Sequence, residues 1–205
     1  MIAAILLAAG RSRRMGAFKP LLPFGDETVI EACIRHLLAG GVEEVVVVVG
    51  HRADEVRAQL AQLPVRFAVN EEAESEMGVS IARGVEALSD EAEAVFIALA
   101  DQPAIPPEAV RRLLDERQRK GASLLIPVHE GRGGHPVLID LKYRAELLRL
   151  DPQSGLRAFF RKHRAQVLRL PVSFPGIARD MDTWDDYRSL YRESFGSEPP
   201  GCPTV

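Results

Sequence analysis

The sequence predicts an α/β protein in which helices cover both faces of a mostly parallel sheet. Up to Val128, apolar runs of strand length alternate with segments whose apolar residues recur at helical spacing. One run is five consecutive valines, Val45–Val49, which indicates a strand buried on both faces, as in a parallel sheet. Regular alternation of this kind favours parallel strands joined by crossover helices.

The elements up to residue 128 follow in a simple order. Strands are expected over Ile2–Ala8, Val45–Val49, Val65–Val69, Ala94–Ala100 and Ser123–Val128. Helices are expected over Thr28–Ala39, Ala53–Leu63 and Val79–Leu88, and a further helix is expected to open at Pro106-Pro107 and run to about Lys120. Gly40 and Gly41 suit the end of the first helix, and a proline suits the first turn of the last.

The pattern changes after residue 128. A glycine-rich loop over residues 131–134 leads into Pro136–Ile139, which we expect to be a short strand at the edge of the sheet. A helix over Ser154–His163, a strand over Gln166–Pro171 and a last helix over Trp184–Tyr191 should follow. We expect residues 1–193 to form one domain and residues 194–205 to form a flexible tail.

The composition excludes several classes of protein. A chain of 205 residues, 46% hydrophobic and 27% charged, is typical of one soluble domain. Its formal net charge of −3 argues against a nucleic-acid partner. Cys33 and Cys202 are too few for a disulfide framework, so we expect a reducing, cytoplasmic location. The apolar start Met1–Gly10 lacks a basic leader and is too short for a membrane span, so no membrane partner is expected.

The carboxyl ends of the predicted parallel strands are where ligands bind in open α/β sheets. The residues at these ends are Gly10, Gly50-His51, Asn70 and Asp101. The strongest signal is the first loop, Leu7-Ala8-Ala9-Gly10-Arg11-Ser12-Arg13-Arg14-Met15-Gly16, followed by Lys19. Small residues let the backbone approach a ligand, successive N–H groups bind anions, and Arg14 and Lys19 add charge that suits a triphosphate. The spacing matches neither a Walker P-loop nor a G-x-G-x-x-G motif, and a basic surface turn is the alternative.

Three aspartates are candidate metal ligands. Asp101 ends a strand beside the first loop, and Mg²⁺ usually takes one or two protein carboxylates plus substrate phosphates. An aspartate that opens a turn before a proline is the alternative. Asp180 and Asp182 lie two apart, so on extended chain they face the same way and could supply a second ligand. Asp182 or Thr183 could instead cap the helix that follows.

Two further loops carry polar residues that could contact substrates. An acidic loop after Asn70 enters a helix through Gly78, and Ser80 could bind a ribose or base, or cap the helix. Arg132 and His135, in a glycine turn, suggest contact with an anionic second substrate, with a hairpin holding a structural histidine as the alternative. The scattered histidines at positions 51, 129 and 163 are assigned no chemistry.

Together these motifs resemble the MobA-like nucleotidyltransferases, and among them the molybdenum cofactor cytidylyltransferase branch, over about residues 2–192. The resemblance rests on Leu7-Ala8-Ala9-Gly10-x-Ser12-x-Arg14-Met15-Gly16-x-x-Lys19, Asp101-Gln102-Pro103, Gly134-His135-Pro136 and Asp180-x-Asp182-Thr183. It implies a three-layer, Rossmann-like fold with a short antiparallel addition in the C-terminal half. It also implies transfer of a nucleoside monophosphate to a phosphorylated acceptor with release of pyrophosphate. In this branch the donor is CTP and the acceptor is a molybdopterin-type cofactor.

The resemblance also implies a role for each candidate residue. The nucleotide would be held by Leu7, Ala8, Ala9, Gly10, Lys19, Asn70, Gly78 and Ser80. The catalytic residues would be Lys19, Arg14 and Asp101. Mg²⁺ would be bound by Asp101 together with Asp180 or Asp182. The acceptor would be contacted by Arg132, Gly134 and His135. A molybdoenzyme or its chaperone is the implied protein partner.

Two positions bear on how well the branch fits. The guanylyl branch usually has glycine where this chain has Ala9, which favours cytidine, whereas Glu76 stands where the family often has glycine. A guanylyltransferase, or a sugar-1-phosphate or methylerythritol-phosphate nucleotidyltransferase, therefore stays open. A non-catalytic nucleotide-binding or cofactor-delivery protein is an alternative of another class. A dinucleotide-dependent oxidoreductase would suit the fold, but the glycine fingerprint is missing.

Overall fold

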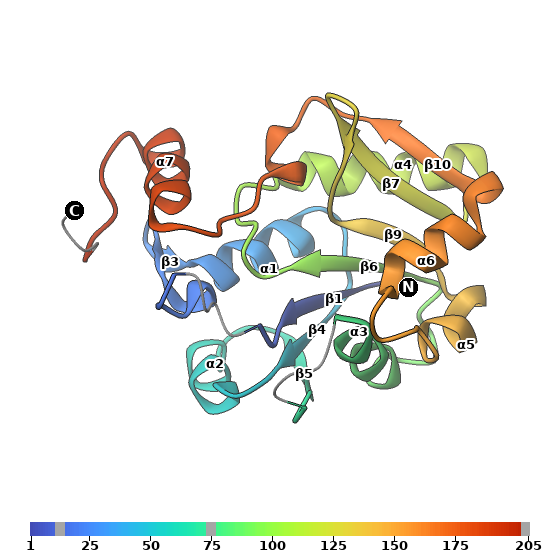
Figure 1. Ribbon diagram of the computed structural model, residues 1–205, viewed down its shortest axis with the longest axis horizontal. Coiled ribbons are helices and arrows are strands. Elements are labelled where there is room, and N and C mark those ends of the chain that lie inside the picture. The colour runs from blue at the N-terminus through green and yellow to red at the C-terminus, as the bar shows by residue number, and fades with distance from the viewer. Residues whose placement is uncertain (11–14, 73–76, 202–205) are drawn as a thin grey trace.

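A twisted sheet forms the middle layer of the computed structural model, which describes residues 1–10, 15–72 and 77–201 (Figure 1). The strand order across the sheet is β10-β7-β9-β6-β1-β4-β5, with β8 paired to β7. The strands are β1 (Ile2–Ala8), β4 (Glu44–Val49), β5 (Val65–Val69), β6 (Ala94–Leu99), β7 (Leu124–His129), β8 (Arg132–Gly133), β9 (Val137–Asp140) and β10 (Val167–Pro171). A separate hairpin pairs β2 (Pro23–Phe24) with β3 (Glu27–Thr28), and neither strand was predicted.

The three central strands are parallel and in matching register. Leu7 of β1 lies opposite Val48 of β4 on one side and opposite Leu99 of β6 on the other. Because all three strands run the same way, their carboxyl ends meet at one edge of the sheet. The predicted parallel sheet is therefore confirmed, and its register brings the segments after β1, β4 and β6 together.

The prediction of an edge strand over Pro136–Ile139 is wrong. Strand β9 lies inside the sheet, between β6 and β7, and is antiparallel to both. Leu138 and Ile139 are fully buried because neighbours flank the strand on both sides. A four-residue run that follows a proline looks like an edge strand locally, since proline cannot donate to a ladder, but its place depends on pairing with distant strands.

The helices cover both faces of the sheet. They are α1 (Val29–Ala39), α2 (Ala53–Gln59), α3 (Met77–Glu86), α4 (Pro107–Lys120), α5 (Arg144–Leu147), α6 (Gly155–Lys162) and α7 (Trp184–Phe195), with 3₁₀ turns η1 (Lys19–Leu21), η2 (Leu141–Tyr143), η3 (Arg164–Gln166) and η4 (Pro175–Ala178). None of the helices in the described ranges combines the length and the apolar character needed to cross a membrane.

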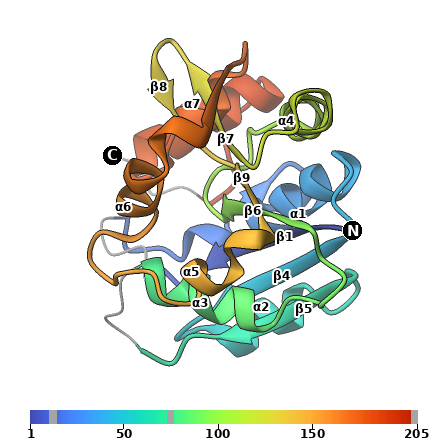
Figure 2. The same cartoon turned by 90° about the vertical axis from the view of Figure 1, so that its right-hand side faces the viewer.

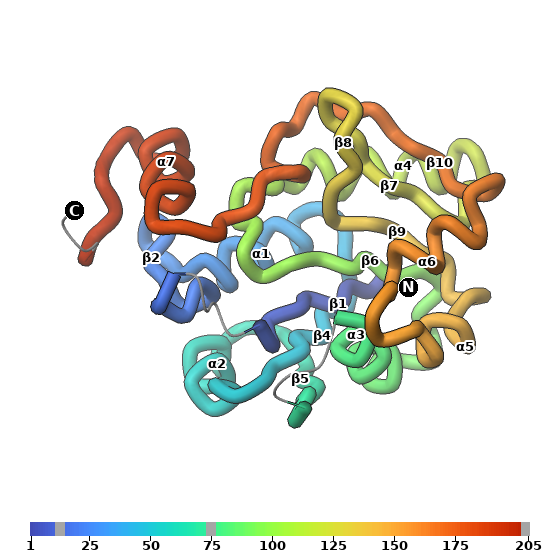
Figure 3. Tube along the Cα trace, in the orientation of Figure 1, coloured from blue at the N-terminus to red at the C-terminus, as the bar shows by residue number. Residues whose placement is uncertain are grey.

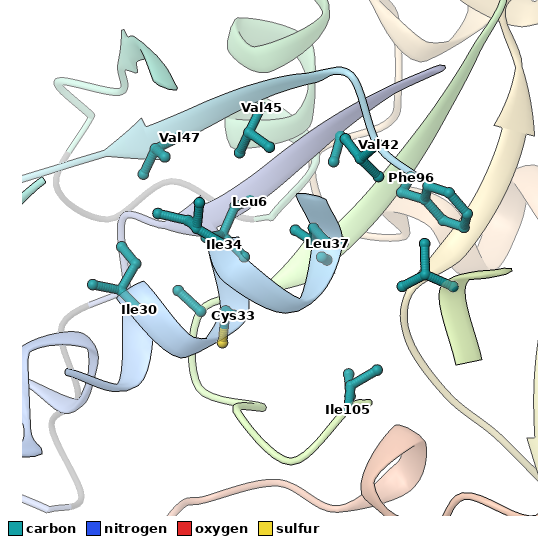
Figure 4. Packing of buried hydrophobic residues seen from close by; sticks show 14 of the residues in the cluster. Leu6, Ile30, Cys33, Ile34, Leu37, Val42, Val45, Val47, Phe96 and Ile105 are labelled. Carbon is teal, nitrogen blue, oxygen red and sulfur yellow. The ribbon is translucent and has the colours of Figure 1, made fainter. Parts of the chain in front are cut away.

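Alternate residues of each strand pack against opposite layers, as the two-residue period of a strand requires. On one face, Leu6 and Val47 pack against α1, α2 and α4, and Figure 4 shows both beside Ile34 of α1. On the other face, Ile5 and Val48 pack against α3, α5 and α6. Figure 2 shows α4 and α6 on opposite sides of the sheet. The valine run is therefore apolar at every position because both of its faces are covered.

The last helix packs outside these layers, beside the β2–β3 hairpin (Figure 3). An additional cluster of buried residues joins Phe24 to Tyr187, Leu190 and Tyr191 of α7. The helix is longer than predicted and passes residue 193, the expected end of the domain, because Phe195 packs its ring 4.9 Å from that of Phe24. Other predicted helix ends differ by a few residues, and α2 ends at Gln59 rather than Leu63.

Candidate active site

The carboxyl-end edge of β1, β4 and β6 brings three predicted segments into contact. Ala9 and Gly10 follow β1, Gly50 follows β4, and Asp101 follows β6. A Cβ atom on Gly50 would lie 2.9 Å from the carbonyl oxygen of Ala9, so the first two segments touch and only glycine fits at that point. Ala8 is buried in the core, and Leu7 is half-buried within β1, so their side chains belong to the sheet.

Lys19 joins this edge to a segment from the far end of the chain. It begins the turn η1, and only 7% of its surface is exposed. Its Nζ donates hydrogen bonds to Asp101 Oδ2 at 3.2 Å and to Asp182 Oδ1 at 2.7 Å. The structure therefore brings together three of the predicted site residues, which are separated by 82 and 163 positions in the sequence.

Among the described residues, Asp101 lies near one cationic side chain, Lys19, and near two further carboxylates, Asp180 and Asp182. Burial raises the pKa of the Asp101 carboxyl above its ordinary value, and Lys19 only partly offsets this effect. The charges of Asp180 and Asp182 also raise the pKa of Asp101, because like charges disfavour one another's ionised form. A cation that arrived at this edge would relieve the repulsion among the three carboxylates.

The site suits a magnesium ion that shares its ligands with a substrate. Within the described part of the chain, no three His, Cys, Asp or Glu side chains form a cluster that could hold a metal by themselves. Mg²⁺ does not need such a cage, because it is usually bound by one or two carboxylates plus substrate phosphates. Asp101 and Asp182 supply hard oxygen atoms, and their side chains are 28% and 38% exposed, so a ligand can reach them.

Asp180 and Asp182 have different hydrogen-bond partners, and Thr183 rather than Asp182 caps the helix that follows. Thr183 caps α7, because its Oγ1 accepts a hydrogen bond from the backbone N–H of Asp186 at 3.2 Å. Asp182 Oδ1 accepts a hydrogen bond from Lys19 Nζ at 2.7 Å, whereas Asp180 Oδ1 accepts one from Gln102 Nε2 at 3.0 Å. The buried Met181 between them anchors the segment in the cluster around α7.

Asn70 and Ser80 form a buried pair beside the first loop. Asn70 Nδ2 donates to Ser80 Oγ at 2.8 Å, and Asn70 Oδ1 accepts from the backbone N–H of Glu72 at 3.1 Å. Ser80 does not cap the helix, since α3 already begins at Met77. A Cβ atom on Gly78 would lie 3.2 Å from the carbonyl oxygen of Asp151, so Gly78 permits close packing against the loop before α6.

A cavity of about 270 Å³ opens between the first loop and Asn70, and Ala9, Gly50 and Glu72 also line it. His51 lines it as well, although the sequence gave this histidine no role. Its ring packs edge-on against Phe18, with 5.8 Å between ring centroids. The signal that could have identified His51 was its position directly after Gly50, at the carboxyl end of β4.

The glycine turn before β9 is held against the segment that precedes Asp180. A Cβ atom on Gly134 would lie 1.9 Å from the carbonyl oxygen of Ile177, so only glycine is accommodated there. The next residue, His135, donates its backbone N–H to the same oxygen at 2.9 Å. Its Nδ1 lies 3.1 Å from the carbonyl oxygen of Ile97. Burial lowers the pKa of His135, and the nearby charges of Asp180 and Asp101 oppose that shift.

The remaining predicted residues lie in different surroundings. Arg132 is exposed in the short β7–β8 hairpin, at the same edge of the sheet. Arg14 and Glu76 lie outside the described residues, so the predicted role of Arg14 stays a prediction.

The fold and the site together define a nucleotidyltransferase-type α/β protein, and the sequence agrees. Residues 4–167 match the MobA-like NTP transferase domain, and the chain belongs to this family. Because this match ends at residue 167, it does not include Asp180 and Asp182. The expected Rossmann-like nucleotidyltransferase fold is confirmed.

Three proteins show the range of its similarities. The nicotine blue oxidoreductase of Paenarthrobacter nicotinovorans is 33% identical, over 92% of this chain and 96% of that protein. The molybdenum cofactor cytidylyltransferase of Escherichia coli K12 is 29% identical, over 91% of this chain and 93% of that protein. The crystal structure of Rv0371c from Mycobacterium tuberculosis H37Rv superimposes with a TM-score of 0.83 and 30% identity, over 93% and 97% of the two chains. A manganese complex of Rv0371c is also similar, with a TM-score of 0.78, 29% identity and coverage of 93% and 98%.

Proposed function

We propose that this protein is a Mg²⁺-dependent nucleotidyltransferase that transfers CMP from CTP to a molybdopterin-type cofactor and releases pyrophosphate. The observation that carries the proposal is the meeting of Lys19, Asp101 and Asp182 beside the loop after β1. Charge neutralisation next to a glycine-containing loop is what transfer from a triphosphate requires. The E. coli cytidylyltransferase, similar along nearly its whole length, supports the choice of reaction.

The chain's own residues would act by positioning and by charge. A phosphate oxygen of the acceptor attacks the α-phosphorus of the nucleotide in line, and the bond to pyrophosphate breaks. The acceptor oxygen is already anionic, so no general base is needed. Lys19, held between two carboxylates, keeps its positive charge fixed at the edge where the phosphates bind, and the backbone N–H groups of the first loop add to it. Mg²⁺ bound by Asp101 with Asp182 or Asp180 would neutralise phosphate oxygens.

The binding cavity supports the assignment of the donor. Ala9 and Asn70 line one cavity, so the loop that would hold the phosphates adjoins a space for the rest of the nucleotide. Ala9 in place of glycine is the feature that favours CTP over GTP. Gly134 and His135 precede β9, which pairs with β6 on the side away from β1, β4 and β5, so we assign that side to the acceptor.

The experiment that tests the proposal measures pyrophosphate release with Mg²⁺ and a molybdopterin acceptor, comparing CTP, GTP, ATP and UTP. We expect a strong preference for CTP and complete loss of activity with EDTA. A preference for GTP would place the chain in the guanylyl branch and contradict the interpretation of Ala9. If none of the four nucleotides supports pyrophosphate release, calorimetry with each nucleotide shows whether the protein binds it. Binding without turnover would indicate a different acceptor, and no binding would indicate a protein that binds no nucleotide.

The similarity to a nicotine blue oxidoreductase favours a second candidate, the dinucleotide-dependent oxidoreductase that the fold also suits. The same preparation should therefore be assayed for oxidation of NADH and NADPH in the presence of nicotine blue. We expect no oxidation above the rate without protein, because the first loop lacks the spacing of a dinucleotide fingerprint. Reductase activity without nucleotidyl transfer would replace the main proposal.

We also propose that the enzyme works in the cytoplasm and passes its product to a molybdoenzyme or to the chaperone of one. The exposed Arg132 hairpin, at the edge that holds the carboxylates, is where the cofactor would leave. Copurification of a tagged chain with a molybdoenzyme would support this transfer, and an Arg132→Ala variant should weaken it without changing pyrophosphate release from a saturating acceptor.

A further inference from the structure

A small cavity lies directly behind the carboxylate edge, between α1 and the end of β6. Its volume is about 10 Å³, which leaves room for about one water molecule. Cys33, His36 and Leu37 of α1 line one side, and Gln102 and Ile105 line the other. Figure 4 shows Cys33 and Leu37 on α1 near Ile105.

Two buried polar atoms belong to residues that line this cavity. Neither His36 Nδ1 nor Gln102 Oε1 has a hydrogen-bond partner among the described residues. Gln102 itself is 4% exposed, so bulk solvent does not satisfy its oxygen. An unsatisfied buried polar atom destabilises the folded state, and native proteins usually satisfy such atoms with ordered water.

The orientation of the Gln102 amide follows from its other hydrogen bond. Asp180 Oδ1 can only accept from Gln102, so the amide nitrogen must be the atom that faces it, at 3.0 Å. The amide oxygen then points the opposite way, away from Asp180. Gln102 therefore connects the exposed carboxylate of Asp180 on one side to the buried cavity on the other.

Burial lowers the pKa of His36, which favours the neutral imidazole, and a neutral imidazole has one N–H donor and one acceptor nitrogen. A water molecule can pair with Nδ1 in either tautomer, because water both donates and accepts hydrogen bonds. Gln102 Oε1 can only accept a hydrogen bond. The cavity thus presents one ring nitrogen and one amide oxygen to a single water molecule.

We propose that one ordered water molecule occupies this cavity, forms a hydrogen bond with His36 Nδ1 and donates one to Gln102 Oε1, and that Gln102, fixed in this way, is a positioning residue for Asp180. A carboxylate on extended chain at the surface can adopt several rotamers. A hydrogen bond from an amide that is itself held on its other side restricts that freedom, as partners behind metal ligands commonly do. The effect on metal binding rests on the proposed function, whereas the water and the Asp180 rotamer do not.

Crystal structures of the wild type and of Gln102→Leu at about 1.5 Å test the geometry. We expect density for one water within hydrogen-bond distance of both His36 Nδ1 and Gln102 Oε1 in the wild type. In Gln102→Leu we expect no ordered water there and a displaced or disordered Asp180 carboxylate. An empty cavity in the wild type would overturn the water, and an unmoved Asp180 in the variant would overturn the positioning role.

Binding of Mn²⁺ to the nucleotide-free protein, followed by electron paramagnetic resonance, tests the consequence for the metal. We expect Gln102→Leu to weaken Mn²⁺ binding about 10-fold. His36→Leu should weaken it about five-fold, the cost of one lost hydrogen bond. His36→Asn keeps a polar atom near the position of Nδ1, and it should bind Mn²⁺ almost as the wild type does.

Val110→Ala is the matched control for packing, because it enlarges the same cavity and leaves both polar atoms in place. It should lower thermal stability without changing Mn²⁺ affinity. If Val110→Ala and Gln102→Leu weaken Mn²⁺ binding equally, Gln102 acts only through packing and the positioning role is overturned. If the wild type binds no Mn²⁺, the proposed metal site fails, and the Asp180 conformation in the Gln102→Leu crystal still decides the role of Gln102.

Discussion

The sheet side of the site and the C-terminal side are built in different ways. Gly10, Gly50 and Asp101 follow adjacent parallel strands, and the register of those strands brings them together. Asp180 and Asp182 follow no strand of the sheet, and they reach the site because Met181 and α7 pack against the β2–β3 hairpin. One side is therefore positioned by backbone hydrogen bonds, and the other by apolar packing between the two ends of the chain.

Lys19 is the link between the two sides, and the difference in construction has a consequence. A substitution on the sheet side removes a functional group and leaves the backbone around it in place. A substitution around α7 leaves the functional groups in place and weakens the packing that positions them. The hydroxyl of Tyr187 shows the attachment, since it donates to the carbonyl oxygen of Pro23 at 2.6 Å. The following predictions separate these two kinds of change.

The largest effect should come from Asp101→Ala on the sheet side. We expect Mg²⁺-dependent pyrophosphate release to fall roughly 10³-fold or more, because a metal–phosphate contact is worth several kcal/mol in the transition state. Asp90→Ala is a matched control, since the Asp90 side chain is fully exposed before β6. Near-wild-type turnover of Asp101→Ala would remove Asp101 from the metal site.

Lys19→Ala should reduce turnover roughly 10²-fold, comparable to the loss of one donor to a developing anion. The variant leaves Asp101 and Asp182 facing each other without the ammonium group between them. We therefore expect a loss in kcat together with weaker binding of nucleotide, measured by steady-state kinetics and calorimetry. If only stability changes, the lysine is a structural ion-pair partner and has no part in the reaction.

Leu190→Ala tests the packing that holds the C-terminal side. Leu190 is 4% exposed in the cluster around α7, and its truncation should cost about 2–4 kcal/mol of unfolding free energy. At temperatures where the variant is folded, we expect kcat to fall while nucleotide affinity stays close to that of the wild type. A loss of nucleotide affinity as large as the loss in kcat would mean that the packing around α7 also positions the sheet side of the site.

The smallest effect should be a pH dependence that originates in Asp101. Its pKa is raised above 3.8 in the folded protein by burial, so the folded state holds this proton more tightly than the unfolded state. The contribution of Asp101 to stability is therefore greatest at low pH and is lost as the pH rises from about 3.8 through the folded pKa. Chemical denaturation of metal-free wild type and Asp101→Asn across this window should show the extra decline only in the wild type.

The raised pKa of Asp101 also predicts where the acid limb of the pH–activity profile lies, that is, the pH range in which activity is lost on acidification. Asp101 must be ionised to bind a cation, so the limb should lie at higher pH than for an aspartate with an ordinary pKa. An acid limb at or below that of a free aspartate would contradict the role of the raised pKa.

Much of the frame could be predicted from the sequence because it depends on local rules. The two-residue and 3.6-residue periods located strands and helices, and glycine, proline and aspartate marked their ends. Thr28 illustrates where such rules stop being exact. It was predicted as the first residue of α1 but is the N-cap, with Glu31 completing the capping box.

Other features could not be predicted because they depend on distant neighbours. Strand β9 is buried inside the sheet although its own sequence suits an edge. His51 follows β4 at the carboxyl edge, but it lines a cavity because Ala9 and Asn70, from other parts of the chain, lie beside it. The β2–β3 hairpin consists of two strands of two residues each. It helps to position the C-terminal side of the site, because α7 packs against it.

The sequence by itself determined that the chain forms an α/β sheet and that a glycine loop and Asp101 lie at its carboxyl edge, because parallel strands in register place such ends side by side. Only the tertiary structure decided which aspartate contacts Lys19 and which contacts Gln102. The spacing of Asp180 and Asp182 allows both to face the site, but their partners lie 78 and 163 residues away. Contacts over such separations are set by the packing of α7 and the sheet, and no local pattern encodes them.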